Sequence, residues 1–257
     1  MGNLREFQLT LLDVMLILDK FLKKNNISYY LIGGSALGAM RHNGFIPWDD
    51  DIDIGMGREE FERFETLDFT PLKKQGLLYC PIGKNVIKNA PIGFLYDLRE
   101  KNADYHTCPT IDIFPIDYVP NSSFLRKAEQ LISFVYHLST SRTAAKNRGK
   151  GSYIFTKTIL TFTPAFMFKL YGKISKKLIL SISKKPTDNV CNIFGMQGYK
   201  KEIMPAKYVH PQKDLEFEGH LLPVPGMTHE YLTHLFSDYM TLPPKDMQKP
   251  HHKSIDT

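Results

Sequence analysis

Four aspartates stand within five residues of this chain, at Asp49, Asp50, Asp51 and Asp53. Residues 51 to 55 alternate acidic and apolar side chains, which is typical of a strand with one buried face. Residues two apart in a strand point the same way, so Asp51 and Asp53 project from one face. Carboxylates this close repel one another unless solvent or a cation separates them. Mg²⁺ binds one or two carboxylates together with substrate phosphates, so the spacing predicts a magnesium site, with Mn²⁺ as the alternative.

A glycine turn, Gly33-Gly34-Ser35, lies shortly before these aspartates. The β-favouring residues 28 to 32 predict a strand that ends at the turn, and Ser35 is placed to cap a short helix that runs to about residue 41. Glycines let a phosphate approach the backbone, and the N–H groups at the start of a helix bind anions. Taken separately, the glycines are typical of an ordinary turn, and the aspartates are typical of a solvated surface. Together they predict a site for a phosphate and a metal.

Three segments of the sequence resemble a known family. Residues 32 to 56 are similar to the signature of the LicD family, which includes bacterial phosphocholine transferases and is related to the fukutin-type proteins. Residues 111 to 117 repeat the likeness, and residues 239 to 244 do so more weakly.

The resemblance implies a nucleotidyltransferase-type core and transfer of a phosphorylated group from a CDP-linked donor. In bacterial members the donor is CDP-choline, the acceptor is a sugar of a surface glycan precursor (teichoic acid, lipopolysaccharide or capsule), and CMP is released. The family pattern places metal ligands at Asp51 and Asp53 and a third at Asp112. Asp117 is the fallback for the third ligand, with a turn-closing role as its alternative. Asp112 is also the candidate base for the attacking hydroxyl. Asp49 and Asp50 are expected before the strand, in supporting contacts or in solvent.

Further residues are candidates for substrate binding. Ser35 and the N–H groups of Gly33 and Gly34 are expected to hold a phosphate. Arg41 is either a phosphate partner or a surface cation that balances the acids. Trp48 is either an aromatic face for a quaternary ammonium group or a packing residue. His252, in the terminal His251-His252 pair, resembles a family element that reaches the phosphates, and its alternative is a solvated surface position.

The elements that position these residues predict an α/β fold, a mixed sheet flanked by helices with a basic helical insertion. Residues 4 to 25 have apolar positions three or four apart and predict an amphipathic helix. Further helices are expected at 58–67, 124–137, 154–180 (with a break at Pro164 or Gly172) and 230–236 (capped by Thr228). Strands are expected at 77–80, 94–98 and 111–114, the last one ending at Pro115. We divide the chain into a catalytic core (1–120), a basic helical module (121–190) and a C-terminal segment that folds back (191–257).

Charge is distributed unevenly along the chain, whose net charge is +6. Residues 122 to 187 contain 13 Lys or Arg and one acid, Glu129. Three interpretations of this stretch stay open: a solvated helical face, a surface that contacts anionic membrane lipids, and a binding face for a polyanionic acceptor. A lipid-linked or soluble glycan is the expected acceptor. The three cysteines form no CxxC pair, and we find no signal peptide or membrane span. We therefore expect a cytoplasmic protein with peripheral contact at the inner face of the cell membrane.

Other functions remain as alternatives. The donor can carry ribitol or glycerol phosphate instead of phosphocholine. A nucleotidyltransferase acting on a small molecule would release pyrophosphate instead of CMP. A sequence pI near 9.0 permits nucleic-acid binding, but the acidic cluster opposes it and no nucleic acid is expected as a partner. An inactive scaffold is disfavoured because the acidic and glycine residues are all retained.

Overall fold

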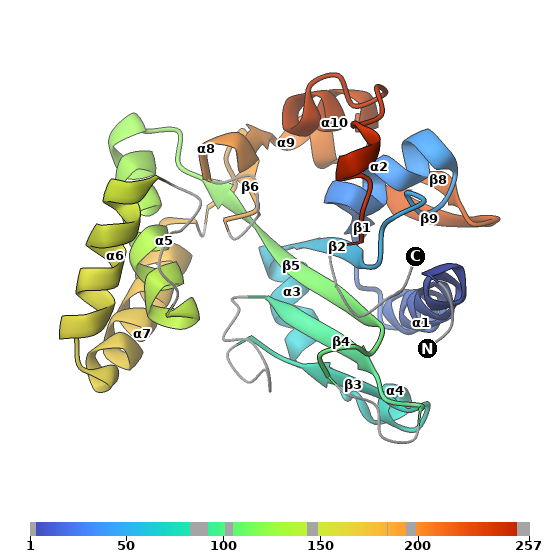
Figure 1. The fold of residues 1–257 in the computed structure, drawn as a ribbon, viewed down its shortest axis with the longest axis horizontal. Coiled ribbons are helices and arrows are strands. Elements are labelled where there is room, and N and C mark those ends of the chain that lie inside the picture. The colour runs from blue at the N-terminus through green and yellow to red at the C-terminus, as the bar shows by residue number, and fades with distance from the viewer. Residues whose placement is uncertain are drawn as a thin grey trace.

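The computed structural model describes residues 4–82, 92–100, 105–142, 149–183, 185–193 and 199–250. The elements that position the acidic residues are a long helix, α1 (Leu4–Lys24), a short strand, β1 (Tyr30–Leu31), a second helix, α2 (Gly33–His42), and strand β2 (Ile52–Gly57). Helices α3 (Arg58–Glu65) and α4 (Thr70–Lys73) follow, and then strands β3 (Leu77–Cys80), β4 (Gly93–Asp97) and β5 (Thr110–Val119). Figure 1 shows these strands as one layer with α1 and α2 on its flank.

The sheet is mixed, as the sequence predicts. Its order is β1-β2-β5-β4-β3, and it continues from the far end of β5 through β6 (Asn189–Cys191) to β7 (Ile203–Pro205). The pair β2–β5 is parallel and the other pairs are antiparallel. A separate hairpin joins β8 (Lys213–Phe217) to β9 (His220–Val224).

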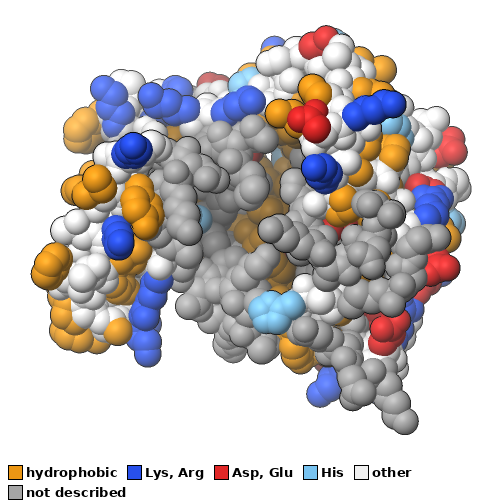
Figure 2. All heavy atoms as spheres, in the orientation of Figure 1, with side chains coloured by type: hydrophobic (Ala, Val, Ile, Leu, Met, Phe, Trp, Pro, Cys, Tyr) orange, Lys and Arg blue, Asp and Glu red, His pale blue; other side chains and the backbone are white. Residues whose placement is uncertain are grey.

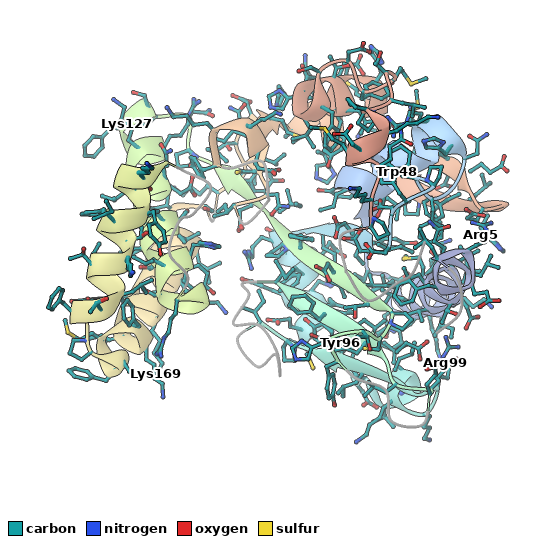
Figure 3. All side chains as sticks on the ribbon, viewed as in Figure 1. Arg5, Trp48, Tyr96, Arg99, Lys127 and Lys169 are labelled. Atoms are coloured by element: carbon teal, nitrogen blue, oxygen red, sulfur yellow. The ribbon has the colours of Figure 1, made fainter. Side chains whose placement is uncertain are left out.

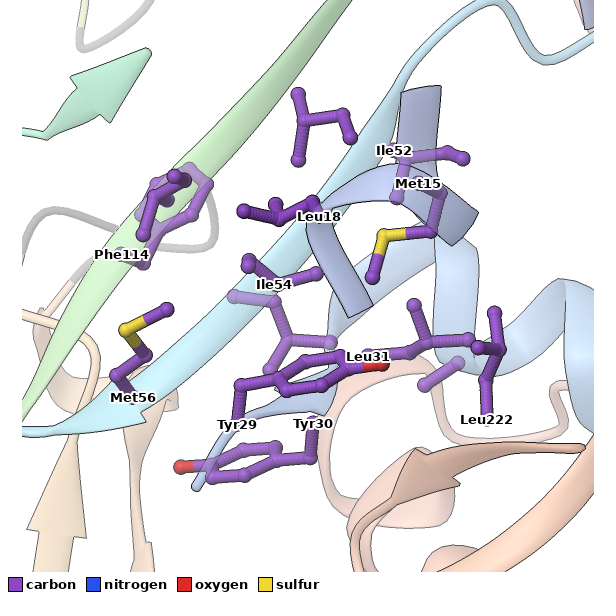
Figure 4. Close-up of a cluster of buried hydrophobic side chains, with 14 of the residues drawn as sticks. Met15, Leu18, Tyr29, Tyr30, Leu31, Ile52, Ile54, Met56, Phe114 and Leu222 are labelled. Atoms are coloured by element: carbon purple, nitrogen blue, oxygen red, sulfur yellow. The ribbon is translucent and has the colours of Figure 1, made fainter. Parts of the chain in front are cut away.

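Helix α1 covers one face of this sheet because its apolar residues recur at helical spacing. Met15 and Leu18 of α1 are fully buried and lie against Ile52 and Ile54 of β2 (Figure 4). The isoleucines of β2 therefore point into the core, and the alternation of the strand directs Asp53 to the opposite face.

Three helices are inserted between the neighbouring strands β5 and β6: α5 (Ser123–Ser141), α6 (Lys150–Phe162) and α7 (Ala165–Ile182). They form a separate group at the left of Figure 1. A small cluster at their base, which includes Val119, Tyr136 and Ile179, joins them to the sheet.

The remaining elements return to the core: α8 (Tyr199–Glu202), α9 (Ala206–Val209), α10 (Thr228–Phe236) and a short 3₁₀ turn (Lys245–Met247). Helix α10 packs against α2, and β9 packs against β1. The C-terminal segment therefore borders the start of α2, where the glycine turn lies.

Several boundaries differ from the sequence-based predictions. The expectation that a strand ends at Pro115 is wrong, because β5 continues to Val119. Pro115 lies after Ile113, the last residue paired with β4, and before Asp117, the first paired with β6. On the edge of β5 that pairs first with β4 and then with β6, no described strand residue is paired with Pro115. The N–H that proline lacks is therefore not needed for pairing on that edge. The helical break falls at Pro164, whereas Gly172 lies inside α7.

Both predicted helix caps are also wrong. Helix α2 begins at Gly33, with Ile32 at its cap position, and α10 begins at Thr228, with Met227 at its cap position. The Ser35 hydroxyl instead accepts a hydrogen bond from the Asp53 N–H, and the Thr228 hydroxyl donates to the Pro225 carbonyl.

Candidate active site

Asp53 and Asp112 are neighbours across the parallel strands β2 and β5, in which they occupy the same register position. Their flanking residues Ile52, Ile111 and Ile113 are fully buried on the α1 side. Both aspartates are partly exposed on the other face. The strand pairing therefore brings together two acids that are 59 positions apart in the sequence.

The loop before β2 adds a second group of acids. Asp49, Asp50 and Asp51 each offer a carboxylate oxygen, and these oxygens lie within 4.8 Å of one another. Asp49 and Asp50 precede the strand, as expected, but both are buried, at 7% and 2% exposure. Sequence reasoning gave them at most a supporting part, although the run of four acids was the available signal.

A side chain from α1 holds this loop. Gln8 is buried, and its amide donates to the carbonyl oxygens of Ile46 (3.2 Å) and Asp49 (2.8 Å). The Asp49 N–H in turn donates to Ile46 O at 2.9 Å, which closes the turn. Nothing in the sequence marks Gln8, because a glutamine on an amphipathic helix is ordinary until the fold places a loop beside it.

The glycine turn lies directly against the acids. Gly33 has a φ of +53°, a conformation that glycine adopts without strain. A Cβ at Gly34 would lie 3.0 Å from Asp49 Oδ2, and one at Gly33 would lie 3.4 Å from Asp53 Oδ2. The turn therefore allows the backbone at the start of α2 to approach the carboxylates closely.

Hydrogen bonds from two other segments fix this arrangement. The Asp53 N–H donates to Ser35 Oγ at 2.9 Å, which ties β2 to α2. The Gly33 N–H donates to the hydroxyl of Tyr231, from α10, at 3.0 Å. Tyr231 is another residue that sequence reasoning missed, since only the return of the C-terminal segment brings it to the turn.

Crowding of acidic side chains distinguishes this region. Burial raises the pKa of Asp49, and the nearby Asp51 and Asp50 raise it further. Burial among surrounding protein atoms likewise raises the pKa of Asp53, followed in effect by the charges of Asp51 and Asp112. Glu202 of α8 also contributes to the raised pKa of Asp53. Acids crowded in this way favour the uptake of protons or of a cation.

The donor set fits a hard divalent cation. Mg²⁺ prefers oxygen ligands, of which one or two are carboxylates and others come from substrate phosphates. Among the described residues, the carboxylates that lie close enough together to share an ion are those of Asp49, Asp50 and Asp51. Of the predicted ligands, Asp51 belongs to this group, while Asp53 and Asp112 are joined to each other by the strand register.

Two of the predicted residues lie elsewhere. Arg41 is at the opposite end of α2 from Gly33, and its guanidinium donates to the Tyr239 carbonyl and to His42. Asp117 is fully buried and forms a double hydrogen bond with Arg58, at 2.7 Å for each. Asp117 lies inside β5, so the predicted turn-closing role is wrong, and its carboxylate is the buried partner of Arg58.

Trp48 is partly buried in the turn just before Asp49 and packs against the main core (Figure 3). His252 lies outside the described residues.

Aromatic side chains that sequence reasoning did not single out stand beside Asp112. Phe94 of β4 is the register partner of Asp112, and Tyr96, labelled in Figure 3, is the partner of Thr110. The Phe94 and Tyr96 rings are stacked at 5.9 Å, and Tyr105 meets Tyr96 edge-on at 5.3 Å. Phe94 and Tyr96 are buried. They therefore form an aromatic layer on the same side of the sheet as the acids.

A mixed sheet that carries acids on adjacent parallel strands, next to a glycine turn, defines a nucleotidyltransferase-type transferase of phosphorylated groups. Residues 26–134 match the family described as LicD/FKTN/FKRP, nucleotidyltransferase domain. The chain is 33% identical over 262 residues to the lipopolysaccharide cholinephosphotransferase LicD of Haemophilus influenzae, covering 97% of this chain and 96% of that protein. This chain therefore belongs to the LicD family and is a phosphotransferase.

Two shorter similarities add to this result. An uncharacterized protein of Rickettsia prowazekii is 33% identical over 106 residues, 38% of this chain and 37% of that protein. The human ribitol 5-phosphate transferase FKRP is 46% identical over 46 residues, 18% of this chain and 9% of that protein.

Proposed function

We propose that this phosphotransferase moves phosphocholine from CDP-choline to a sugar hydroxyl of a cell-surface glycan precursor and releases CMP. The observation that carries this proposal is the end-to-end similarity to a lipopolysaccharide cholinephosphotransferase. The clustered acids and the glycine turn supply the binding groups that a diphosphate donor requires.

The catalytic groups follow from the geometry of the site. Asp51, Asp53 and Asp112 would hold Mg²⁺, with Mn²⁺ as a substitute. When bound, the ion neutralises negative charge on the diphosphate. Gly33 and Gly34 bring the start of α2 close to the carboxylates of Asp53 and Asp49, so a metal ion on these acids and the N–H dipoles of the helix start would both favour a phosphate at this place. Ser35, through its bond to the Asp53 N–H, keeps the turn and the strand in register.

The transfer itself exchanges one phosphorus–oxygen bond for another. The acceptor hydroxyl oxygen forms a bond to the phosphocholine phosphorus, and the bond from that phosphorus to the oxygen of the leaving CMP breaks. Asp112 accepts the proton of the attacking hydroxyl, since a general base must lie within hydrogen-bond reach of it. The partial exposure of Asp112 leaves it accessible to a substrate.

The aromatic layer offers a means of recognising choline. Quaternary ammonium groups are attracted to aromatic faces. In the strand register, Phe94 pairs with Asp112 and Tyr96 pairs with Thr110, on the same face of the sheet. Trp48 remains the second candidate, next to the acidic loop. Tyr96→Leu should then raise KM for CDP-choline by about tenfold and leave KM for CDP-glycerol unchanged, whereas Tyr96→Phe retains a ring and serves as the matched control. Equal losses with both donors would remove Tyr96 from headgroup recognition.

A second donor is favoured by one observation, the similarity to a ribitol 5-phosphate transferase. CDP-ribitol, and by the same chemistry CDP-glycerol, would use the same metal and phosphate groups and would also release CMP. These donors carry no quaternary ammonium group, so the aromatic layer would have no part in recognising them.

The test measures CMP release and labelled acceptor with CDP-choline, CDP-ribitol and CDP-glycerol, in Mg²⁺, in Mn²⁺ and in EDTA. Donor hydrolysis without acceptor is recorded separately, and Asp51→Asn is the inactive control. Metal-dependent choline transfer supports the proposal, and transfer from either other donor changes the donor but keeps the mechanism. Pyrophosphate release from a nucleoside triphosphate, with no CMP from any donor, would replace phosphotransfer by nucleotidyl transfer.

A further inference from the structure

The helices inserted between β5 and β6 leave an unusual amount of apolar surface exposed. Of the residues described in α6, Thr156 alone is buried. The stability of a helix in a protein comes mostly from packing of its apolar face, yet α6 gains little from the rest of the chain. The exposed apolar side chains of α6 are therefore available for contact with another molecule.

These exposed apolar side chains continue along α7. Phe162, at the end of α6, is 80% exposed, and Phe166, in the first turn of α7, is 70% exposed. They flank the turn at Thr163 and Pro164 that joins α6 to α7, and we call the two helices with this turn the α6–α7 hairpin. The exposed residues that extend the surface from this turn include Ile154, Phe155, Leu170 and Ile174.

The same hairpin is strongly basic. Helices α6 and α7 contain six lysines and no acidic residue. Glu129 of α5, the one acid between residues 122 and 187, is fully buried and accepts hydrogen bonds from Ser183 and Tyr199. Figure 2 shows lysine and apolar side chains interspersed over this group of helices, at the left of the molecule.

The combination of positive charge and exposed apolar surface favours an anionic bilayer over a second copy of this chain as the partner. A second copy of this chain would bring two lysine-rich surfaces together without an acid to balance them, which is unfavourable. A bilayer surface with anionic lipids offers both an apolar layer for the phenylalanines and negative headgroups for the lysines. Lysine side chains extend toward water while their methylene groups lie along apolar surface, which suits this boundary.

The hairpin is suited to lie on a bilayer. Within the described part of the chain, no helix combines the length and apolar character needed to cross a membrane. An amphipathic helix at an interface needs only to place its apolar face about 5–10 Å into the boundary between headgroups and acyl chains.

We propose that the α6–α7 hairpin is a membrane-binding element, which inserts Phe162 and Phe166 into an anionic leaflet and sets Lys157, Lys169 and Lys173 among its headgroups. This surface lies outside the acidic site, so the proposal does not depend on which donor the enzyme uses. It gives the enzyme access to acceptors that are themselves attached to lipid.

The test is co-sedimentation of the full chain with vesicles of phosphatidylcholine alone and of phosphatidylcholine mixed with phosphatidylglycerol. Wild-type protein should bind the anionic vesicles more tightly, and added salt should weaken the binding. Phe162→Ser with Phe166→Ser should lower the partition coefficient at least about tenfold, because two aromatic side chains lose their apolar environment. Lys169→Gln with Lys173→Gln should reduce the preference for anionic vesicles.

Matched controls keep the result interpretable. Leu221→Ser and Met247→Ser change side chains that are 65% and 68% exposed outside the hairpin, and these variants should bind as the wild type does. Circular dichroism and donor hydrolysis confirm that each variant is folded.

Three results would overturn the proposal. The first is wild-type protein that stays in the supernatant with both vesicles, and the second is a phenylalanine variant that binds like the wild type. The third is a wild-type dimer, seen by light scattering, that the phenylalanine substitutions convert to a monomer without any change in vesicle binding, which would assign the surface to a second copy.

Discussion

Asp53 and Asp112 lie at the same register position of the parallel strands β2 and β5. This relationship places one carboxylate from each strand on the face opposite the α1 core, next to the glycine turn. The two residues are therefore expected to act together on the same metal ion and the same phosphate.

Asp53→Asn and Asp112→Asn should each lower the rate of CMP release about a thousandfold or more, because each removes a charged group that acts on the transferring phosphate. Circular dichroism should show that both variants keep the fold, since each substitution preserves the size of the side chain. Glu59→Gln, at an exposed position on α3, is the matched control and should retain wild-type turnover. Wild-type rates in both aspartate variants would remove these residues from the mechanism.

Metal binding should change how stability depends on pH. Without metal, the raised pKa values of Asp49 and Asp53 mean that the folded state retains protons that the unfolded state releases. The free energy of unfolding in EDTA should therefore fall as the pH rises above about 4, the ordinary pKa of a carboxyl group. Mg²⁺ binds the ionised carboxylates, so its stabilising effect should grow in the same direction.

Thermal unfolding with Mg²⁺ and with EDTA, from about pH 5 to about pH 8, measures this difference. The increase in Tm caused by Mg²⁺ should be larger at the higher pH and should disappear in Asp51→Asn. An increase that is independent of pH and persists in Asp51→Asn would place the metal elsewhere.

Gln8→Ala should weaken the acidic loop. The substitution removes the Gln8 hydrogen bonds to the carbonyl oxygens of Asp49 and Ile46, of which the Ile46 oxygen still accepts from the Asp49 N–H, and this loss should cost about 1–3 kcal/mol of unfolding free energy. Metal affinity should fall as well, because the loop that carries Asp51 loses its anchor. Urea unfolding and metal titration measure the two effects. Gln75→Ala is the control, because the Gln75 side chain is exposed and donates to the Pro71 carbonyl of its own segment.

Gly34→Ala tests how closely the turn approaches the acids. The added Cβ would meet Asp49 Oδ2 at 3.0 Å, so the Asp49 carboxylate must give by a few tenths of an ångström. This small displacement should lower turnover, but by less than the roughly hundredfold loss that a misplacement of about 1 Å causes. Gly57→Ala is the matched control, since a Cβ there would meet nothing within 4 Å. Similar activity in the two variants would show that the close approach at Gly34 has no part in catalysis.

Asp117→Ala should affect stability and not chemistry. The substitution leaves the Arg58 guanidinium buried without its carboxylate, at a cost of about 3–5 kcal/mol. Chemical denaturation measures this loss, and CMP release per folded molecule should stay near the wild-type value. A selective loss of turnover at unchanged stability would return Asp117 to the role of third catalytic carboxylate.

The sequence by itself determined the local parts of this protein. The acid–apolar alternation at residues 51 to 55 and 111 to 114 identified two strands, and the glycines before them indicated a helix there, although α2 begins at Gly33 and not after Ser35. These features are visible because strand and helix periodicities act over a few residues. The same local patterns identified the long first helix and the basic helical insertion.

The tertiary structure decided which of these parts meet. Strand pairing selected Asp112 over Asp117 as the neighbour of Asp53, because register is set by long-range packing that no local pattern contains. Gln8, Tyr231 and Glu202 reach the site from distant segments, and nothing in their own neighbourhoods marks them. Only the packing of the helices revealed that Ile154, Phe155 and Phe162 of α6 stay exposed.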